Sequence, residues 1–252
     1  MSAAPKPYYA TDSGSALYYD LVTAADTSLA GDIAIYAELA GRRASILELG
    51  TGTGRVAIGL AERGYDVTGI DIAPTMLRQA EAKQRALPAH VAARLRFVRG
   101  DLTALALGRH FDAIFVPYFT LAHLQPATSW RKAFAGIARH LAPGGIVALH
   151  LPVADQMAAP PPPPDRPVFG ATIDGDRMLT LFVAGKTFPK PDRMTLSLDY
   201  VVATRSGTRV SRSREVLTYF AADPIPYAER AGLRSSRAPI PLGKSGMIHI
   251  FE

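Results

Sequence analysis

Apolar and polar positions alternate along the first 152 residues in a pattern that predicts strands and helices in turn. Short apolar runs with the length of buried strands occupy residues 45–49, 65–70, 95–98, 111–116 and 146–151. Segments with helical spacing lie at 14–40, 56–63 and 74–86, and a further helix has a core face of Trp130, Phe134, Ile137 and Leu141. Strands that alternate with helices predict a parallel sheet, with a ligand at the carboxyl ends of its strands.

The pattern changes after residue 152. A five-proline run at 160–164 marks a stiff exposed loop. The long strand-like stretches that follow, at 178–184, 194–204 and 208–220, predict an antiparallel insertion rather than another βα unit. A short helix at 223–231 and two strands at 233–238 and 247–251 end the chain. We therefore expect an N-terminal helical lid (1–42), a ligand-binding core (43–152), the insertion (153–220) and a C-terminal helix with closing strands (221–252).

Three glycines at alternate positions, Gly50, Gly52 and Gly54, follow the first strand directly. The next segment, 56–63, has helical spacing and ends before Gly64. Because glycines lack side chains, the polar end of a ligand can approach the backbone there, where the N–H groups of a helix N-terminus point outward. This strand, turn and helix predict a ligand cradle.

The spacing of the glycines distinguishes between two ligands. Dinucleotide-binding turns have the pattern G-x-G-x-x-G, whereas this turn has G-x-G-x-G, with Arg55 where the third dinucleotide glycine would be. Glu48 adds a carboxylate at the strand end, which disfavours a pyrophosphate and suits a cation. A cationic, zwitterionic ligand such as S-adenosylmethionine (SAM) therefore fits better than NAD.

Two further acids follow the next predicted strands. Asp71 closes the second strand 17 residues after Gly54, near the ~20 expected for an acid that accepts hydrogen bonds from both ribose hydroxyls. Asp101 follows the third strand, where it can accept a hydrogen bond from an adenine amino group while Leu102 packs against the ring. Because carboxyl ends of parallel strands share one edge of a sheet, we expect both acids beside the glycine turn.

Composition limits the class of protein. The chain has 252 residues, 48% of them hydrophobic, which is enough for a sizeable core, and it contains no cysteine. We predict no metal site, because no group of His, Asp and Glu has the spacing of metal ligands. The first residues lack the apolar core of a signal peptide, and no apolar run approaches the ~20 residues of a membrane span. We expect a soluble cytoplasmic protein.

A net charge of +6 invites a nucleic-acid partner, yet the arginines are scattered along the chain. The densest group, Arg209, Arg212 and Arg214, lies on a predicted strand and is more simply explained as a solvated face. We therefore expect a small-molecule substrate, with no nucleic acid and no membrane as partner, and we leave monomer and homodimer open.

Four features in this order resemble class I SAM-dependent methyltransferases: residues 48–54, Asp71, residues 100–102 and residues 141–145. The resemblance implies SAM as cofactor and S-adenosylhomocysteine (SAH) as product. It also implies a Rossmann-like α/β fold with a seven-stranded, mostly parallel sheet, whose antiparallel last strand would be 247–251. The cofactor-binding residues that it implies are Tyr18, Glu48, Gly50, Thr51, Gly52, Gly54, Arg55, Asp71, Ile72, Met76, Gly100, Asp101, Leu102 and Pro117.

Residues 18–21, residues 121–124 and the strand insertion resemble small-molecule N-methyltransferases that act on glycine, amino sugars and natural products. The N-methyltransferase of toxoflavin (azapteridine) biosynthesis is among the proteins that the chain resembles. Enzymes that methylate amines of DNA bases have an Asp/Asn-Pro-Pro-Tyr type motif after the fourth strand. Here residues 116–119 read Val-Pro-Tyr-Phe, which argues against nucleic-acid methylation.

Aromatic residues near the expected methyl position are candidates for a dry substrate pocket. We expect Tyr8, Tyr9, Tyr19, Tyr118, Phe119 and His150 to bind substrate. His123 and Tyr118 are the candidate catalytic residues, for positioning more than for acid–base chemistry. Each candidate also has a plainer interpretation. The tyrosines could cap the core with their hydroxyls in water, and the histidines could be hydrogen-bonded core groups. Among the cofactor candidates, Arg55 could likewise be a surface residue and Met76 a core residue.

The function predicted is SAM-dependent methyl transfer to a nitrogen of a small, planar heterocyclic or amine metabolite of natural-product biosynthesis. The reaction is an in-line displacement, for which the nucleophile must be held about 3 Å from the methyl carbon. An O-methyltransferase, a nucleic-acid methyltransferase, a nicotinamide oxidoreductase and a non-catalytic SAM sensor are the alternatives.

Overall fold

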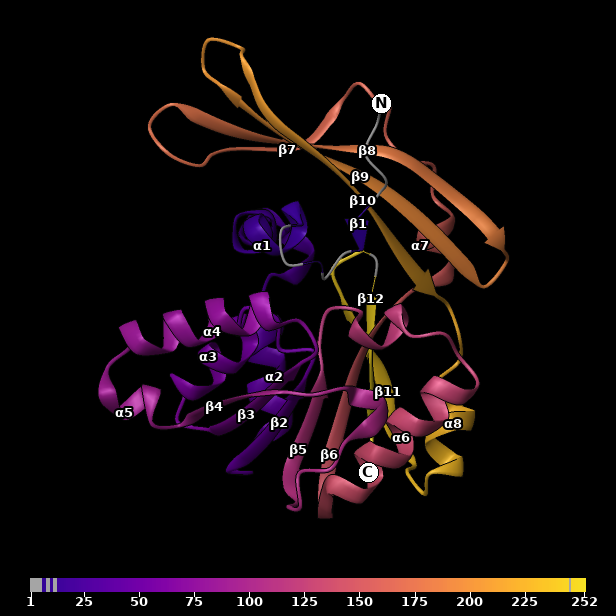
Figure 1. Cartoon of the computed structure of the whole chain (residues 1–252). Coiled ribbons are helices and arrows are strands. Elements are labelled where there is room, and N and C mark those ends of the chain that lie inside the picture. Colours follow the sequence, from indigo (N-terminus) through magenta and orange to yellow (C-terminus); the bar gives the residue numbers. More distant parts are fainter. Residues whose placement is uncertain (1–5, 8–9, 11–12, 245) are drawn as a thin grey trace. The chain divides into compact units, whose positions relative to one another are not determined.

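A computed structural model describes residues 6–7, 10, 13–244 and 246–252 (Figure 1). Contacts between Cα atoms divide the chain into a smaller unit, residues 1–27 with 154–219, and a larger unit, residues 28–153 with 220–252. The short helix η1 (Thr27–Leu29) spans their boundary along the chain. This division differs from the expected boundaries, because residues 28–42 group with the core whereas residues 1–27 group with the insertion.

A seven-stranded sheet forms the centre of the larger unit. In pairing order its strands are β11 (Ser235–Leu242), β12 (Gly246–Phe251), β6 (Leu141–Pro152), β5 (Phe111–Val116), β2 (Ser45–Leu49), β3 (Asp66–Asp71) and β4 (Leu95–Arg99). Strands β6, β5, β2, β3 and β4 pair in parallel, and β12 pairs antiparallel with β6 and with β11. The expected mostly parallel sheet with an antiparallel last strand is confirmed.

The larger unit also contains the helices α2 (Asp32–Ala40), α3 (Arg55–Ala61), α4 (Pro74–Ala86), α5 (Ala89–Ala92), α6 (Thr128–His140) and α8 (Ile225–Arg230), with short helices η2 (Leu102–Ala104) and η3 (Thr120–His123). The expected core residues Trp130, Phe134 and Ile137 of α6 are fully buried. Leu141 is only half-buried and begins β6, which corrects its assignment to the core face of the helix. The helix ends because residue 141 adopts an extended backbone and Pro143 follows.

The smaller unit is a five-stranded sheet with one long helix (Figure 1). Its strands pair in the order β1 (Lys6–Pro7), β10 (Arg209–Phe220), β9 (Arg193–Thr204), β8 (Arg177–Lys190) and β7 (Pro167–Thr172). Pairing of β7, β8 and β9 is antiparallel, as expected for the insertion. Tyr18 and Val22 of helix α1 (Gly14–Ala25) pack against the buried cluster of this sheet. The remaining helix is α7 (Ala154–Ala158).

The structure adds strands that the sequence pattern did not reveal. Strand β7 alternates between exposed and half-exposed residues, so it lacks the apolar run that marks a buried strand. Strand β1 has two residues and pairs parallel with β10. Among the described residues, no helix has the length and apolar character needed to cross a membrane.

Candidate functional site

The glycine turn between β2 and α3 is held against the end of β3. Gly50, Gly52 and Gly54 have φ angles of +73°, +56° and +80°, in the left-handed region where a Cβ is disfavoured. The N–H groups of Gly50 and Thr51 both donate to the Ile70 carbonyl, at 2.8 and 2.9 Å. The turn therefore has one backbone conformation, fixed by the neighbouring strand.

Asp71, at the carboxyl end of β3, contacts the same turn through its side chain. Its Oδ2 accepts the Gly52 N–H at 2.8 Å, and its Oδ1 accepts the Ala73 N–H at 2.8 Å. Burial raises the pKa of the Asp71 carboxyl, while these backbone N–H groups act to lower it. Since each carboxylate oxygen has two lone pairs, each can also accept a hydrogen bond from a ribose hydroxyl. The geometry thus fits the ribose-binding role that the sequence suggests.

Glu48 lies under the turn. Its side chain is 2% exposed and accepts the Thr51 hydroxyl at 2.7 Å. Burial raises the pKa of Glu48 to about 8, and the hydrogen bond from Thr51 and the charge of Arg55 act to lower it. The sequence suggested a carboxylate that faces a cationic ligand, whereas this carboxyl supports the turn from below.

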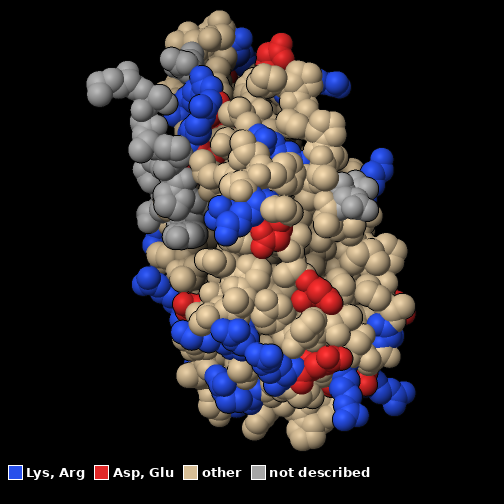
Figure 2. Space-filling model, turned by 90° about the vertical axis from the view of Figure 1, so that its right-hand side faces the viewer, with Lys and Arg blue, Asp and Glu red and all other residues tan. Residues whose placement is uncertain are grey.

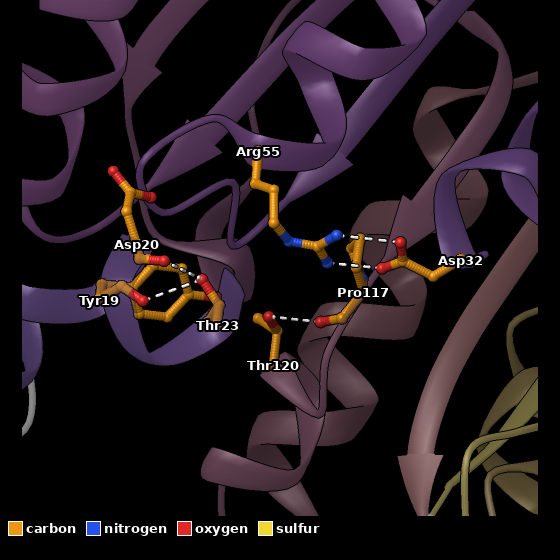
Figure 3. A network of polar contacts seen from close by, with 7 residues as sticks. All are labelled: Tyr19, Asp20, Thr23, Asp32, Arg55, Pro117 and Thr120. Atoms are coloured by element: carbon orange, nitrogen blue, oxygen red, sulfur yellow. Dashed lines mark hydrogen bonds and ion pairs between the residues drawn. The ribbon is translucent and has the colours of Figure 1, made fainter. Parts of the chain in front are cut away.

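Arg55 is the first residue of α3 and is bound to a carboxylate that the sequence analysis missed. Its Nη1 and Nη2 atoms lie 2.9 and 2.5 Å from the two carboxylate oxygens of Asp32, in the first turn of α2 (Figure 3). Asp32 is 2% exposed, so the pair places a buried negative charge next to a fixed guanidinium. No motif marks Asp32, because its partner is 23 residues away.

The residues expected around an adenine are divided between surface and core. Asp101 is exposed, and its Oδ1 accepts from the N–H and hydroxyl of Thr103 at 2.7 and 2.8 Å, which caps η2. Leu102 is half-buried, and Ile72 is 51% exposed immediately after Asp71. Met76 is 6% exposed and belongs to the core. Ile72 is therefore the apolar side chain best exposed to a flat base.

The acceptor oxygens and the apolar surface beside the glycine turn fit the ribose and the base of SAM. The carboxyl of Asp71 is anchored by two backbone N–H groups beside a turn of left-handed glycines. At Gly100 an added Cβ would lie 2.9 Å from Ile70, so the backbone there is closely packed on β3. A hydroxyl-bearing ribose and a flat base match this combination of acceptor oxygens and apolar surface.

The loop after β5 has an unusual backbone. Pro117 is buried, and the next two residues, Tyr118 and Phe119, have φ angles of 45° and 63°. Left-handed conformations cost non-glycine residues about 1–3 kcal/mol each, so surrounding contacts must enforce them. The rings of Tyr118 and Phe119 stack with centroids 5.7 Å apart. The loop thus presents a fixed aromatic pair, both members half-buried.

Thr120 connects this loop to the glycine turn. Its hydroxyl donates to the Pro117 carbonyl at 2.9 Å (Figure 3), and its Cγ2 would lie 2.2 Å from a Cβ added to Gly50. Gly50 therefore allows the close approach of two segments that are distant in sequence. His123, three residues later, is half-buried in η3. Sequence reasoning identified the loop but had no signal for Thr120.

His150 is placed differently from the expectation of a substrate contact. It lies in β6, is 2% exposed, and its ring centroid is 4.4 Å from that of Phe119. A Cβ added to Gly246 would lie 1.9 Å from His150 Nε2. The histidine thus packs between the strained loop and the start of β12.

Tyr18 and Tyr19, two of the aromatic residues expected from the N-terminal segment, belong to the smaller unit. Tyr18 packs against its buried cluster, and the carbonyl of the half-buried Tyr19 accepts the Thr23 hydroxyl at 2.8 Å (Figure 3). Tyr8 and Tyr9 lie outside the described residues. Tyr18 therefore has a packing role of its own within the smaller unit.

Charged residues form separate groups on the surface. On the face drawn in Figure 2, Asp and Glu side chains lie between several groups of Lys and Arg. On β10, Arg212 and Arg214 both pair with the buried Asp199 of β9, and they remain 47% and 41% exposed. Within the part of the chain that the structure describes, no group of three or more His, Cys, Asp or Glu could hold a metal ion.

Comparison with known proteins finds a family match that includes the glycine turn and its neighbours. Residues 46–145 match the family described as methyltransferase domain. Over 197 residues the chain is 28% identical to dTDP-4-amino-2,3,4,6-tetradeoxy-D-glucose N,N-dimethyltransferase of Saccharopolyspora spinosa, which covers 77% of this chain and 73% of that protein. The chain spans only 40–50% of the length of three further relatives.

Solved structures agree on the fold of the whole chain. The CcbJ methyltransferase from Streptomyces caelestis superposes with a TM-score of 0.72 at 21% identity, over 96% of this chain and 97% of that one. The SAM-bound amino pentose methyltransferase CalS10 from Micromonospora echinaspora gives 0.69 at 22% identity, over 94% and 97%. At these identities the likeness establishes the fold, and the narrower resemblance to the toxoflavin enzyme stays a prediction.

Proposed function

We propose that this SAM-dependent methyltransferase transfers a methyl group to an amine nitrogen of a small natural-product intermediate. One observation carries the choice of acceptor. The match to the amino-sugar N,N-dimethyltransferase extends over 197 residues, about twice the length of the methyltransferase-domain segment 46–145. The similarity thus includes residues outside the cofactor domain, where substrate choice would be decided.

The cofactor would be held at the carboxyl ends of β2 and β3. Asp71 would accept hydrogen bonds from the ribose hydroxyls, and Asp101 would accept one from the amino group of the base. Ile72 and Leu102 would pack against the base, and the N–H groups of the glycine turn would bind the polar end of the ligand. When bound, SAM supplies an electrophilic methyl group on a sulfonium. Arg55, oriented by Asp32, is placed at the start of α3 beside this turn.

The acceptor would lie against the loop after β5. The stacked rings of Tyr118 and Phe119 form an apolar wall that excludes water from the reacting nitrogen. An amine is mostly protonated near neutral pH and must lose a proton before it attacks. The Tyr118 hydroxyl would hydrogen-bond to the nitrogen and orient it, and the His123 imidazole would take up the proton.

Binding and turnover can test the two halves of this proposal separately. Isothermal titration of the purified protein with SAH, SAM and NAD⁺ should give micromolar binding of the first two and none of the third. Incubation with SAM and a dTDP-linked 4-amino sugar should add one methyl mass, and His123→Gln should slow that step. Binding of NAD⁺ without SAM would contradict the cofactor assignment, and SAM binding without methylation of the sugar would contradict the acceptor.

A flat N-heterocycle, such as the azapteridine skeleton of toxoflavin, is a second candidate acceptor. The stacked Tyr118–Phe119 pair favours it, because a planar ring gains most from an aromatic wall. A competition assay with equal concentrations of the amino sugar and a pteridine separates the two candidates. Preferential methylation of the pteridine, lost in Phe119→Leu, would replace the amino sugar as acceptor.

A further inference from the structure

We propose that His150 and Gly246 are positioning residues that hold the Tyr118–Phe119 wall in place for the methyl acceptor. This inference rests on the proposed function, because it gives the aromatic pair its role. It assigns His150 a supporting part in place of the substrate contact that the sequence suggested, and it gives a function to a glycine outside every motif of the family.

The first step concerns what holds the strained loop. Phe119, with φ of 63°, contacts His150 twice: its N–H donates to the His150 carbonyl at 3.2 Å, and its ring lies 4.4 Å from the imidazole. One residue of β6 thus fixes both the backbone and the ring of Phe119. Since the Tyr118 ring stacks on Phe119, the placement of both rings depends on His150.

The second step concerns what holds His150. On β6 it lies between β5 and β12, and it is 2% exposed. On β12, Ile248 is the register partner of His150, and Gly246 lies two residues before it, opposite Pro152. Position 246 leaves no room for a side chain, because an added Cβ would be 1.9 Å from His150 Nε2 and 2.9 Å from Phe119 Cε1. Gly246 does not have a positive φ, so space rather than backbone conformation requires glycine there.

The third step concerns the cofactor side. Thr120 follows Phe119 directly and is fixed separately, by its hydrogen bond to Pro117 and its packing on Gly50. A shift of the aromatic pair should therefore change acceptor binding much more than cofactor binding. A residue that supports the whole fold would affect both.

The test is the substitution Gly246→Ala, with Gly175→Ala as its matched control. Gly175 has open space around its Cβ position and no positive φ, so its substitution should be silent. For Gly246→Ala we expect faster hydrogen exchange at the Phe119 amide and a KM for the dTDP-linked amino sugar raised about tenfold. The kcat and the Kd of SAH should change less than threefold. Unchanged exchange at Phe119, or an equal loss of SAH binding, would overturn the proposal.

A double-mutant cycle identifies His150 as the mediator. His150→Ala alone should loosen Phe119 and raise the KM, and it removes the ring that the new methyl group meets. Adding Gly246→Ala to it should then cause a much smaller change than in the unmodified protein, because the new methyl group meets only the Phe119 ring, at 2.9 Å from Cε1, so the two effects are strongly non-additive. Additive effects would contradict the proposal, and the His150→Ala arm decides it even if Gly246→Ala alone does not fold.

The failure of the proposed function has a different signature. If the unmodified protein binds SAH but methylates neither the amino sugar nor the pteridine, the acceptor role of the wall is overturned together with the proposed acceptors. Exchange at Phe119 still decides whether Gly246 and His150 hold the loop, because that measurement uses the protein and SAH alone.

Discussion

The turn after β2 and the loop after β5 lie at the same edge of one sheet, yet they are held in place in different ways. The turn uses glycines, and hydrogen bonds from its backbone end on β3, which is close in sequence. The loop uses non-glycine residues in left-handed conformations, fixed by side chains of β6 and by the start of β12. The turn is thus fixed mainly by backbone hydrogen bonds, whereas the loop depends on the packing of side chains.

The largest expected effect is on the turn side. Asp71→Ala removes the acceptor of the Gly52 and Ala73 N–H groups and the proposed partner of the ribose hydroxyls. We expect the Kd of SAH to rise about 100-fold, which corresponds to about 2.7 kcal/mol. Isothermal titration measures it, with Asp101→Asn as an exposed control that should cost less than tenfold. An equal rise in the Kd of SAH in the two variants would show that Asp71 contributes no more to cofactor binding than the exposed Asp101.

The second effect tests the buried charge pair behind the turn. Asp32→Asn leaves Arg55, whose side chain is 24% exposed, without its carboxylate partner. We expect a loss of about 2 kcal/mol in the free energy of unfolding, less than for a fully buried pair because water reaches the guanidinium. Urea unfolding measures it. The exposed pair of Asp66 with Arg94 gives the control: Asp66→Asn should cost less than about 0.5 kcal/mol.

These differences also explain how much could be predicted from the sequence. The glycines, Asp71 and Asp101 could be predicted as candidate site residues because each follows a recognisable apolar run within a short stretch of chain. Asp32, Thr120 and Gly246 were missed, because their roles arise from contacts between distant segments. The parallel pairing in the larger sheet could be predicted from the alternation of strands and helices, but strand β7 could not, since it lacks an apolar run.

The third effect is a pH dependence of stability that arises at Glu48. Its folded pKa of about 8 is raised above the unfolded value near 4.5, so the folded protein binds more protons than the unfolded chain between these limits. By linkage, the free energy of unfolding must therefore fall as the pH rises from about 5 to 8, by about 1.4 kcal/mol per pH unit at most.

Glu48→Gln tests this assignment, because glutamine resembles the protonated acid and can still accept from Thr51. We expect this variant to lose the slope between pH 5 and 8 while it binds SAH about as well as the unmodified protein near pH 6. Urea unfolding at several pH values provides the measurement. A slope that persists in Glu48→Gln would show that another group titrates, and the carboxyl under the turn would then be ionised.

The smallest expected effect tests whether packing, rather than hydrogen bonding, holds the loop after β5. Thr120→Val keeps the methyl group that packs on Gly50 but removes the hydroxyl that donates to Pro117. Because the Thr120 N–H also donates to that carbonyl, at 3.2 Å, the acceptor keeps a partner and the cost should be about 1 kcal/mol or less. Thr120→Ser keeps the hydroxyl and loses the methyl group, so it should leave a small void against Gly50 and cost more. Unfolding in urea ranks the two variants. If Thr120→Ser lowers the free energy of unfolding less than Thr120→Val, hydrogen bonding holds the loop more than packing does. The loop and the glycine turn would then differ only in how many hydrogen bonds hold them.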